Sequence, residues 1–376
     1  MIYFDSAATS FQKPAAVRRA VLSAMEGMSS PARGDYLPAR RAAETLYRCR
    51  EEAAALFGME NSENVVFTFN ATHALNIAIR SLIKDGDRVV LSGYEHNAVT
   101  RCLAAFENLE TAVAKAPLFD KNAMAEAFDC LITKDTAAVI CTHVSNVFGF
   151  VLPVDEIAEM CKGRGVPLIV DAAQSAGAIA VDAKKWQAAF IAMPGHKGLL
   201  GPQGTGLLLC GEAAQPLLYG GTGSESLKQK MPHFLPDRLE AGTHNVPGIA
   251  GLLEGIRFVK ETGFTAIENK KETLVNAFAK TMEGAPRCHL FLPPVGQRRS
   301  GVVSAVFQGM ECEEMASRLA RRGICVRAGY HCAPLAHATA GTWESGTVRF
   351  SFSPFNTVAE AIGGAETVRD ILLRSR

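Results

Sequence analysis

The feature that most constrains the fold is an alternation of amphipathic helices with short apolar runs, from about residue 13 to residue 255. Most of these runs are continuous apolar stretches with polar residues only near their ends, which is typical of strands buried on both faces of a sheet. Helices between successive strands favour an α/β domain with a mainly parallel sheet, whose ligands bind at the carboxyl ends of the strands. The expected strands are Asn64–Phe69, Arg88–Ser92, Ala137–Thr142, Pro167–Asp171 and Thr205–Cys210.

The segment Pro14–Met28 is predicted to be a helix that packs one face against the core. Its apolar residues recur at the spacing that brings them to one side of a helix. We interpret this face as a packing surface without a chemical role. The residues expected on it are Val17, Ala20, Val21, Ala24, Met25 and Met28.

After about residue 256 the pattern changes to one that predicts a smaller α+β domain. At 376 residues the chain exceeds the roughly 100 to 200 residues of one ordinary domain. We expect a large domain of residues 15–255 and a small domain of residues 1–14 and 256–376. The small domain is expected to contain strand Gly301–Phe307, helix Glu313–Arg322, short strand Ile324–Arg327, strand Thr347–Ser353 and a final helix.

The charge balance indicates which partners to expect. With 39 basic and 38 acidic residues the formal net charge is +1, so neither nucleic acid nor an anionic membrane is an expected partner. No apolar segment reaches the ~18 residues that span a bilayer, and the N-terminus does not resemble a secretion signal. Ten cysteines occur without a CxxC pair, mostly in apolar segments. This usage predicts a protein of the reducing cytoplasm.

Polar residues follow two of the expected strands. At Asn70–Thr72 a strand gives way to a helix, which leaves backbone amides and a hydroxyl at the positive helix end, where an anion can bind. The alternative is an ordinary helix cap. Asp171 ends another strand, with Gln174 on the following turn. A carboxylate there can hold the ring nitrogen of a pyridoxal cofactor protonated, although an Asp that caps the next turn is the commoner case.

Lys197 lies in the glycine-rich segment AMPGHKGLLGPQGTG, where glycines let the backbone approach a ligand closely. Such a lysine can form a Schiff base, whereas a solvated lysine in a turn is the alternative. An Asp at a strand end, followed by a Lys in a glycine-rich turn one βαβ-type unit later, is less often accidental. The pair therefore favours the catalytic interpretation.

Cys332 is the candidate nucleophile. It lies in VRAGYHCAPLAH, near Arg327, Gly329 and His331, a setting that can lower a thiol pKa and expose the sulfur. A metal site formed by His331, Cys332 and His337 is the alternative, but the spacing is poor and no fourth ligand is evident. For the other nine cysteines a buried, inert thiol is the stronger expectation.

Arg349, in GTVRFSFSPFNT, is a candidate for binding a substrate carboxylate. Its planar guanidinium matches the two carboxylate oxygens. The alternative is a surface arginine on an edge strand.

Taken together, the motifs resemble those of the cysteine desulfurase and selenocysteine lyase group, among the class V aminotransferase-like, fold type I pyridoxal-phosphate enzymes. The resemblance covers nearly the whole chain, in segments of matching order and spacing. It implies a mainly parallel, seven-stranded sheet in the large domain. The segments are YFDSAATSFQKP, EHNA, HVSNVFG, VDAAQ, GHKG, EAGTHN, GYHCAP and VRFSFSPFNT.

The resemblance implies pyridoxal 5′-phosphate as the cofactor and gives a role to each matching residue. Lys197 would form the Schiff base, Asp171 would pair with the pyridinium nitrogen, Gln174 would contact the ring hydroxyl, His96 would stack on the ring, and Ala71, Thr72 and His196 would contact the phosphate.

Four further residues are implied at the edges of the site. Thr243 resembles a threonine that this family lends to the phosphate of the neighbouring subunit, which implies a homodimer with shared active sites. Asn146 and Arg349 resemble the grip on the substrate carboxylate, with Asn146 also beside the cofactor. Arg33 of ARGD resembles an arginine near the entrance of the family's active site.

The implied reaction removes sulfur from L-cysteine, or selenium from L-selenocysteine, and releases alanine. Lys197 would remove the α-proton, Cys332 would attack the substrate sulfur and become a persulfide, and His96 would move a proton at the sulfur. A sulfur-acceptor protein and a part in iron–sulfur cluster assembly are further implications. GYHCAP is similar to the short cysteine loop of the second desulfurase group.

Two departures from the family pattern bear on these expectations. Pro194 stands where desulfurases usually carry a hydroxyl residue, so one phosphate hydrogen bond is absent or supplied elsewhere. The stretch from LYGG to THN is shorter than its counterpart in the second group, which leaves the acceptor open.

Three alternatives stay open at this point. The first is transamination or C–C lysis, in which Lys197 and Asp171 keep their roles and Cys332 is incidental. The second is selenocysteine lysis, which need not use an attacking thiol. The third is a binding domain that has lost its chemistry, and this would require a broken motif, whereas Lys197, Asp171 and Cys332 are all present.

Overall fold

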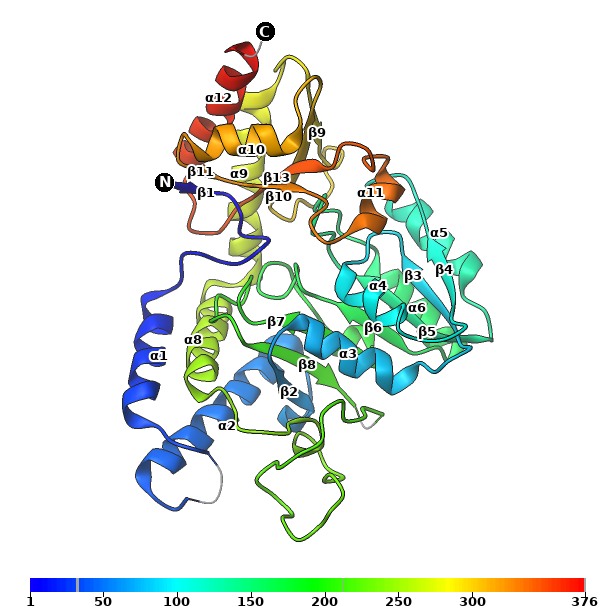
Figure 1. Cartoon of the computed structure of the whole chain (residues 1–376), viewed down its shortest axis with the longest axis vertical. Helices are drawn as coiled ribbons and strands as arrows, with labels where there is room; N and C mark the ends of the chain where they lie inside the picture. The colour runs from blue at the N-terminus through cyan, green and yellow to red at the C-terminus, as the bar shows by residue number, and fades with distance from the viewer. Residues whose placement is uncertain (32–33, 212, 375–376) are drawn as a thin grey trace.

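A seven-stranded sheet forms the centre of the protein, as a computed structural model that describes residues 1–31, 34–211 and 213–374 shows (Figure 1). The strand order is β2-β8-β7-β6-β5-β3-β4, and only β8 runs antiparallel to its neighbours. The mainly parallel α/β architecture predicted from the sequence is therefore confirmed. The strands are β2 (Val65–Thr68), β3 (Arg88–Ser92), β4 (Glu110–Ala114), β5 (Thr136–Thr142), β6 (Leu168–Asp171), β7 (Phe190–Pro194) and β8 (Gly206–Cys210).

Two of these strands, β4 and β7, were not expected individually from the sequence. β4 lies at the edge of the sheet, and its first two residues are exposed, so it lacks a continuous buried run. β7 is fully buried but ends in Pro194, directly before the glycine-rich segment, and proline is a poor indicator of a central strand. β7 lies between β6 and β8, so it connects the Asp171 strand with the segment that carries Lys197.

Helices cover both faces of the sheet because side chains alternate along each strand. Val65, Phe67 and Val139 belong to a core shared with α2, α5, α6 and α8, whereas Val66 and Ala138 belong to a core shared with α3 and α4. The helices are α2 (Leu37–Phe57), α3 (Ala71–Leu82), α4 (Asn97–Leu103), α5 (Lys121–Leu131), α6 (Val154–Arg164) and α8 (Val246–Thr262); a short α7 (Ala183–Trp186) precedes β7.

A second, four-stranded antiparallel sheet has the order β12-β13-β10-β9 and shares its core with α9, α10 and α12 (Figure 1). The N-terminal strand β1 joins this half of the molecule by pairing with β11. The division into domains at residues 14 and 255 stays a prediction. The elements are β1 (Ile2–Tyr3), α9 (Phe264–Met282), β9 (Cys288–Phe291), β10 (Val302–Phe307), α10 (Cys312–Ala320), β11 (Ile324–Cys325), β12 (Arg327–Gly329), α11 (Pro334–Ala340), β13 (Thr347–Ser351) and α12 (Val358–Arg374).

Two expectations about single elements were wrong. The strand expected at Ile324–Arg327 is two strands, because β11 pairs with β1 while β12 pairs with β13. Helix α1 (Ala15–Gly27) packs on α8 through Val17 and Ala24, but Met25 is 68% exposed. Val17 and Ala24 are the buried residues of α1, so a residue at the margin of the apolar face stays outside the core. Within the described part of the chain, no helix has the length and apolar character needed to cross a membrane.

Candidate active site

A cavity opens at the carboxyl ends of the parallel strands, with an empty volume of about 720 Å³ including its mouth. Strands β5, β6 and β7 end at Thr142, Asp171 and Pro194, and all three residues line this active-site cavity. The fold therefore brings most of the expected site residues together from distant parts of the sequence. Those that line the cavity are Ala71, Thr72, His96, Asn146, Asp171, Gln174, His196 and Lys197.

Asp171 presents a buried carboxylate to the cavity. Its Oδ1 accepts a hydrogen bond from the backbone N–H of Ala173 at 2.8 Å. Burial raises the pKa of this carboxyl, and the positive charge of Lys197 opposes the rise. Among the described residues no hydrogen bond reaches Oδ2, so that oxygen is available to a donor inside the cavity.

Lys197 lies just after β7, and burial lowers the pKa of its amine to about 8, against the opposing effect of Asp171. Its amine makes no hydrogen bond within residues 1–31, 34–211 and 213–374. The preceding carbonyl, of His196, accepts bonds from Ser10 N at 2.9 Å and Ser10 Oγ at 2.8 Å. The N-terminal segment therefore fixes the backbone of the lysine, while the amine stays free to react.

The start of helix α3 is a pre-formed anion site. Asn70 caps the helix, and its side chain accepts the N–H of His73 at 2.9 Å. The preceding amides, of Ala71 and Thr72, belong to the first turn and have no partner inside the helix. Pro194, across the cavity, offers neither a hydroxyl nor an N–H group, so it adds no donor for an anion.

His96 is held in one neutral tautomer. Its Nδ1 accepts the backbone N–H of Ala98 at 3.0 Å, so in the neutral ring the proton is on Nε2. Burial, and next the charge of Lys197, lower the pKa of His96 to about 4. At neutral pH the imidazole therefore offers an N–H donor to the cavity.

Cys332 lies in an exposed loop beside the active-site cavity. Its carbonyl accepts the N–H of Asn97 at 2.7 Å, which places the loop next to the start of α4 and to His96. His331 and Cys332 have φ angles of 50° and 56°, in the left-handed region that non-glycine residues rarely adopt. Cys332 is also close enough to Lys197 to interact with it electrostatically, although burial and then Asp171 have the larger effects on the pKa of the lysine.

The sequence suggested His331 as one cause of an activated thiol, and the structure does not support that part of the expectation. Burial lowers the pKa of His331 to about 2, so its ring is neutral at physiological pH. Its Nε2 lies 3.0 Å from Thr347 Oγ1. Three cations are close enough to Cys332 to interact with it electrostatically, and they are Lys197, Arg327 and Arg349.

Arg349 is a buried part of an ion network, not a surface residue of an edge strand. Strand β13 is internal in its sheet, and Arg349 is 2% exposed. Its Nη2 donates to Asp5 Oδ1 at 3.0 Å and its Nη1 donates to the carbonyl of Asn146 at 3.0 Å. The side-chain amide of Asn146 donates in turn to the carbonyl of His331 at 2.8 Å, next to Cys332. Arg349 has five N–H groups, so the network leaves donors for a carboxylate.

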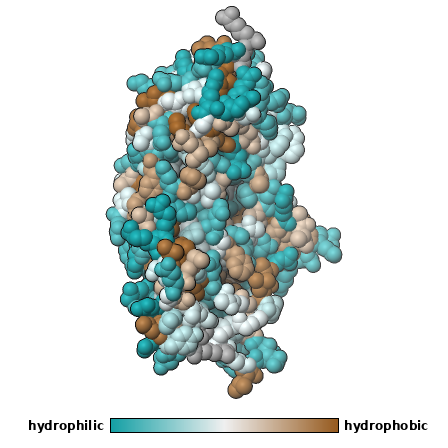
Figure 2. Space-filling model, turned by 60° about the vertical axis from the view of Figure 1, so that its left-hand side comes forward, coloured by the Kyte–Doolittle hydropathy of each residue, from teal (hydrophilic) through white to brown (hydrophobic). Residues whose placement is uncertain are grey.

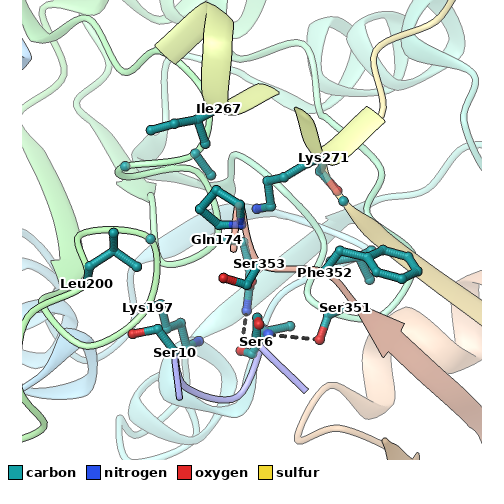
Figure 3. Close-up of a pocket in the computed structure, with 18 residues that line it drawn as sticks. Ser6, Ser10, Gln174, Lys197, Leu200, Ile267, Lys271, Ser351, Phe352 and Ser353 are labelled. Atoms are coloured by element: carbon teal, nitrogen blue, oxygen red, sulfur yellow. Dashed lines mark hydrogen bonds between the residues drawn. The ribbon is translucent and has the colours of Figure 1, made fainter. Parts of the chain in front are cut away.

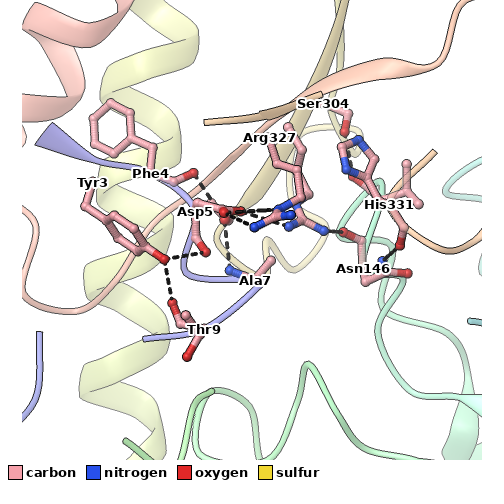
Figure 4. Close-up of polar contacts among 12 residues, drawn as sticks. Tyr3, Phe4, Asp5, Ala7, Thr9, Asn146, Ser304, Arg327 and His331 are labelled. Atoms are coloured by element: carbon pink, nitrogen blue, oxygen red, sulfur yellow. Dashed lines mark hydrogen bonds and ion pairs between the residues drawn. The ribbon is translucent and has the colours of Figure 1, made fainter. Parts of the chain in front are cut away.

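Asp5 is the residue of this network that the sequence did not reveal. Figure 4 shows Arg327 facing Asp5, with the Arg327 Nη2 to Asp5 Oδ2 distance at 2.8 Å. Asp5 therefore forms ion pairs with both Arg327 and Arg349. The available signal was an acidic residue directly after the apolar residues Tyr3 and Phe4, which is too common to interpret by itself.

Other expected residues lie elsewhere or have other partners. Thr243 is exposed and lines a separate pocket with Phe67 and His244. Arg33 lies outside the described residues. Gln174 lines the active-site cavity, but its amide donates to the carbonyl of Ala7 at 2.9 Å, which leaves its oxygen for a ligand.

Two cysteine expectations can also be compared with the structure. Cys130, on α5, is exposed like Cys332, and Cys288 and Cys325 are half-buried, so the expectation that the other nine thiols are buried was wrong for these three residues. The expected metal alternative involved His337, whose Nδ1 lies 2.7 Å from Thr342 Oγ1. Within the described parts of the chain, no group of three or more His, Cys, Asp or Glu residues is arranged to hold a metal ion.

The donor set of the cavity fits pyridoxal phosphate. The cofactor needs a primary amine for its aldehyde, a carboxylate for its ring nitrogen, and donors for its phosphate. Lys197 has an unbonded amine, Asp171 has an oxygen without a partner, and the amides of Ala71 and Thr72 face the same cavity. The residues present therefore match each of the three functional groups of the cofactor.

Comparisons with known proteins show which family this chain is similar to. The aminotransferase class-V family model matches residues 2–361. A probable cysteine desulfurase of Methanothermobacter thermautotrophicus is 32% identical over 384 residues, 98% of this chain and 94% of the relative. One of Mycolicibacterium paratuberculosis is also 32% identical, over 96% of this chain, but the match spans only 54% of that longer protein. The apo structure of cysteine desulfurase from Thermococcus onnurineus is 30% identical, covers 99% of this chain and 94% of its own, and superposes with a TM-score of 0.90.

Proposed function

Because this chain belongs to the aminotransferase class-V family, within its cysteine desulfurase group, we propose that it removes sulfur from L-cysteine and leaves it as a persulfide on Cys332. This membership confirms the family resemblance and the fold type I class predicted from the motifs. The family generally depends on pyridoxal phosphate. The observation that carries the proposal is an exposed cysteine whose backbone bonds to Asn97, next to His96 in the wall of a cavity that Lys197 and Asp171 also line.

The chain's own residues would hold the cofactor at three points. Lys197 would attach it covalently, Asp171 Oδ2 would accept a hydrogen bond from its protonated ring nitrogen, and the first amides of α3 would bind its phosphate. When bound, pyridoxal phosphate supplies a ring that accepts electron density from the substrate α-carbon. Asp171 supports this property because its negative charge keeps the ring nitrogen protonated.

Lys197 and His96 would divide the proton chemistry. Because burial lowers the pKa of the Lys197 amine to about 8, about a tenth of it is neutral at pH 7, compared with well under a thousandth at its ordinary pKa, and this neutral form can take a proton from the substrate α-carbon. His96 is neutral and carries its proton on Nε2, because Nδ1 is occupied by the Ala98 amide. We therefore assign to His96 a hydrogen bond donated at the substrate sulfur.

Cys332 would carry out the sulfur transfer itself. Its thiolate attacks the substrate sulfur, so an S–S bond forms while the Cβ–S bond of the substrate breaks. The electron pair of the broken bond stays on the carbon skeleton, which takes up protons and leaves as alanine. One cysteine and one Cys332 thiol thus give one alanine and one persulfide. Arg349 would orient the substrate through donors that the Asp5 network leaves unused.

The active form is proposed to be a homodimer with shared sites. Thr243 does not line the active-site cavity of its own chain, and it is exposed, as a residue lent to a second subunit must be. Large apolar side chains are also exposed on α1 and α2, and Figure 2, which brings this side of the molecule forward, has hydrophobic residues among hydrophilic ones on its surface. They include Leu22, Met25, Leu37 and Tyr47.

A sulfur-acceptor protein is proposed as the second partner. Cys332 is exposed, and two aromatic side chains lie on the same surface, Tyr330 and Trp343, with the Tyr330 hydroxyl 2.9 Å from the Trp343 carbonyl. Exposed aromatic residues are frequent in protein interfaces. A part in iron–sulfur cluster assembly and a cytoplasmic location stay predictions.

The experiment that tests the function compares L-cysteine with L-selenocysteine as substrates of the cofactor-loaded protein. Alanine, sulfide and selenide are measured in the presence of a reductant, together with any keto acid. Alanine with stoichiometric sulfide from L-cysteine supports the desulfurase. Activity with L-selenocysteine alone would assign the lyase alternative, and keto acid without sulfide would assign an aminotransferase.

A further inference from the structure

A second pocket lies behind the active-site cavity, between α9, the N-terminal segment, the end of β13 and the segment that carries Lys197 (Figure 3). We call it the Lys271 pocket, after the α9 lysine on its wall. Its empty volume is about 500 Å³ including the mouth. Gln174 and Lys197 line both cavities, so this pocket and the active-site cavity share a wall.

Lys271 brings an amine into this pocket without a partner. Figure 3 shows its side chain extending from α9 toward the centre of the pocket, near Ser353. The side chain is largely enclosed, and burial lowers the pKa of its amine to about 8. No hydrogen bond or ion pair of this amine occurs within the described residues. The nearest acid on α9, Glu268, is already paired with Arg298 at 2.6 Å.

The stem of Lys271 is held in place by Gly301. A Cβ atom on Gly301 would lie 2.6 Å from Lys271 Cε, and Gly301 has φ of +90°, so only glycine suits this position. The lysine therefore crosses a surface without side chains on its way into the pocket. This close packing favours a fixed direction for the amine over a freely moving one.

The rest of the wall offers donors and no negative charge. Of the described residues, those that line the pocket include Lys197 and Lys271 but no aspartate or glutamate. Ser6 Oγ is buried at this wall without a hydrogen-bond partner. Ser353 Oγ accepts the N–H of Phe355 at 3.2 Å, which leaves its own hydrogen for another acceptor. An unpaired cation on a pocket wall that carries hydroxyl donors and no acid is the environment of an anion site.

We propose that the Lys271 pocket binds a small anion, a carboxylate or an inorganic oxyanion, through the ammonium group of Lys271. Sulfate, phosphate and acetate are small anions of this chemistry and serve as probes of the pocket. A bound anion would bridge α9 and the N-terminal segment. It would also place a negative charge close to Lys197, which lines both this pocket and the active-site cavity. The site goes beyond the proposed function, because it requires no sulfur chemistry and lies outside the active-site cavity.

The direct test uses the wild-type, cofactor-loaded protein and needs no variant. An amine-acetylating reagent is applied with and without sulfate, phosphate, acetate or alanine at constant ionic strength, and the modified lysines are quantified by peptide mass spectrometry. At an anion concentration about tenfold above Kd, acetylation of Lys271 should fall about tenfold, because only the free fraction reacts. Lys280, exposed on the same helix, should react at an unchanged rate.

The outcomes separate the two ligand sources. Protection by sulfate and phosphate alone assigns an inorganic oxyanion, and protection by acetate or alanine assigns a carboxylate. Equal acetylation of Lys271 under all conditions would overturn the proposal and leave a pocket that holds only water.

Variants provide the second measurement. Thermal unfolding of the wild type should shift upward saturably with the protecting anion, and Lys280→Met should behave like the wild type. Lys271→Met should show no saturable shift, because it keeps the length of the stem and loses the charge. A saturable shift of the same size in Lys271→Met would contradict the assignment of the anion to Lys271.

Discussion

Glu95, directly before His96, is a buried carboxyl group that should make the stability of the protein fall as the pH rises. It is 0% exposed, and its Oε1 accepts bonds from Ser92 Oγ and from the N–H of Thr142, the latter at 2.7 Å. Its Oε2 is buried and has no partner within the described chain. Burial, followed by the nearby charge of Asp171, raises the pKa of Glu95 from 4.5 to about 8. The carboxyl is therefore protonated at neutral pH.

This raised pKa makes wild-type stability depend on pH. The unfolded chain releases the Glu95 proton near pH 4.5, whereas the folded chain retains it until about pH 8. The contribution of the proton to stability is thus complete below pH 4.5 and is lost as the pH rises toward 8. At ~1.36 kcal/mol per pH unit, the loss between pH 5 and pH 7 is at most about 2.7 kcal/mol, and about 1 to 2 kcal/mol is a realistic range.

The variant Glu95→Gln should escape this loss. The amide has the same shape, keeps an oxygen for Ser92 and Thr142, and leaves one buried polar group unpaired, as the protonated carboxyl does. Urea unfolding at pH 5, 6, 7 and 8, with both proteins saturated with cofactor, measures the two free energies. The free energy of unfolding of Glu95→Gln, relative to the wild type, should rise steadily from pH 5 to pH 8. That of the control Glu126→Gln, whose side chain is exposed on α5, should show no such rise. A constant difference between Glu95→Gln and wild type across this range would refute the reasoning.

Two further predictions concern the amine and the ion network. Since burial lowers the pKa of Lys197 to about 8, imine formation by the cofactor-free protein should slow as pH falls through about 8; stopped-flow absorbance measures the rate, and a midpoint near 10 would contradict the assignment. Asp5→Ala should cost about 3–5 kcal/mol of unfolding free energy, because it leaves Arg349 buried without its counter-charge. Asp129→Ala, which breaks an exposed pair with Arg164, should cost no more than about 1 kcal/mol, and equal losses in the two variants would count against a buried network.

Local signals were enough to predict five of the seven strands of the large sheet, together with the residue that ends the Asp171 strand. Asp171 follows an uninterrupted apolar run, and a buried strand must place the polar residue after it at the carboxyl edge of the sheet. Lys197 was predicted from the glycines around it, and the structure places both residues on one cavity. The signals for Asp171 and Lys197 each lie within one short segment of the sequence, so these candidate residues can be identified without knowledge of distant contacts.

Long-range pairings could not be predicted in the same way. Asp5 and Arg349 are 344 positions apart, and nothing near either residue identifies the other as its partner. Met25 has the correct helical spacing for a core residue, yet its exposure depends on how little of α1 is covered by α8. The neutral state of His331 likewise depends on burial by the completed fold. Each of these features is set by tertiary packing.

The central claim is that Cys332 is the sulfur carrier, and comparing Cys332→Ala with Cys130→Ala tests it most directly, because these variants remove the two exposed thiols one at a time. Alanine and sulfide are measured from L-cysteine with excess pyridoxal phosphate and a reductant, and intact mass is recorded before the reductant is added. We expect Cys130→Ala to form both products and to gain the mass of one sulfur, while Cys332→Ala forms neither product and gains no sulfur. Equal product formation by the two variants would show that Cys332 does not carry the sulfur.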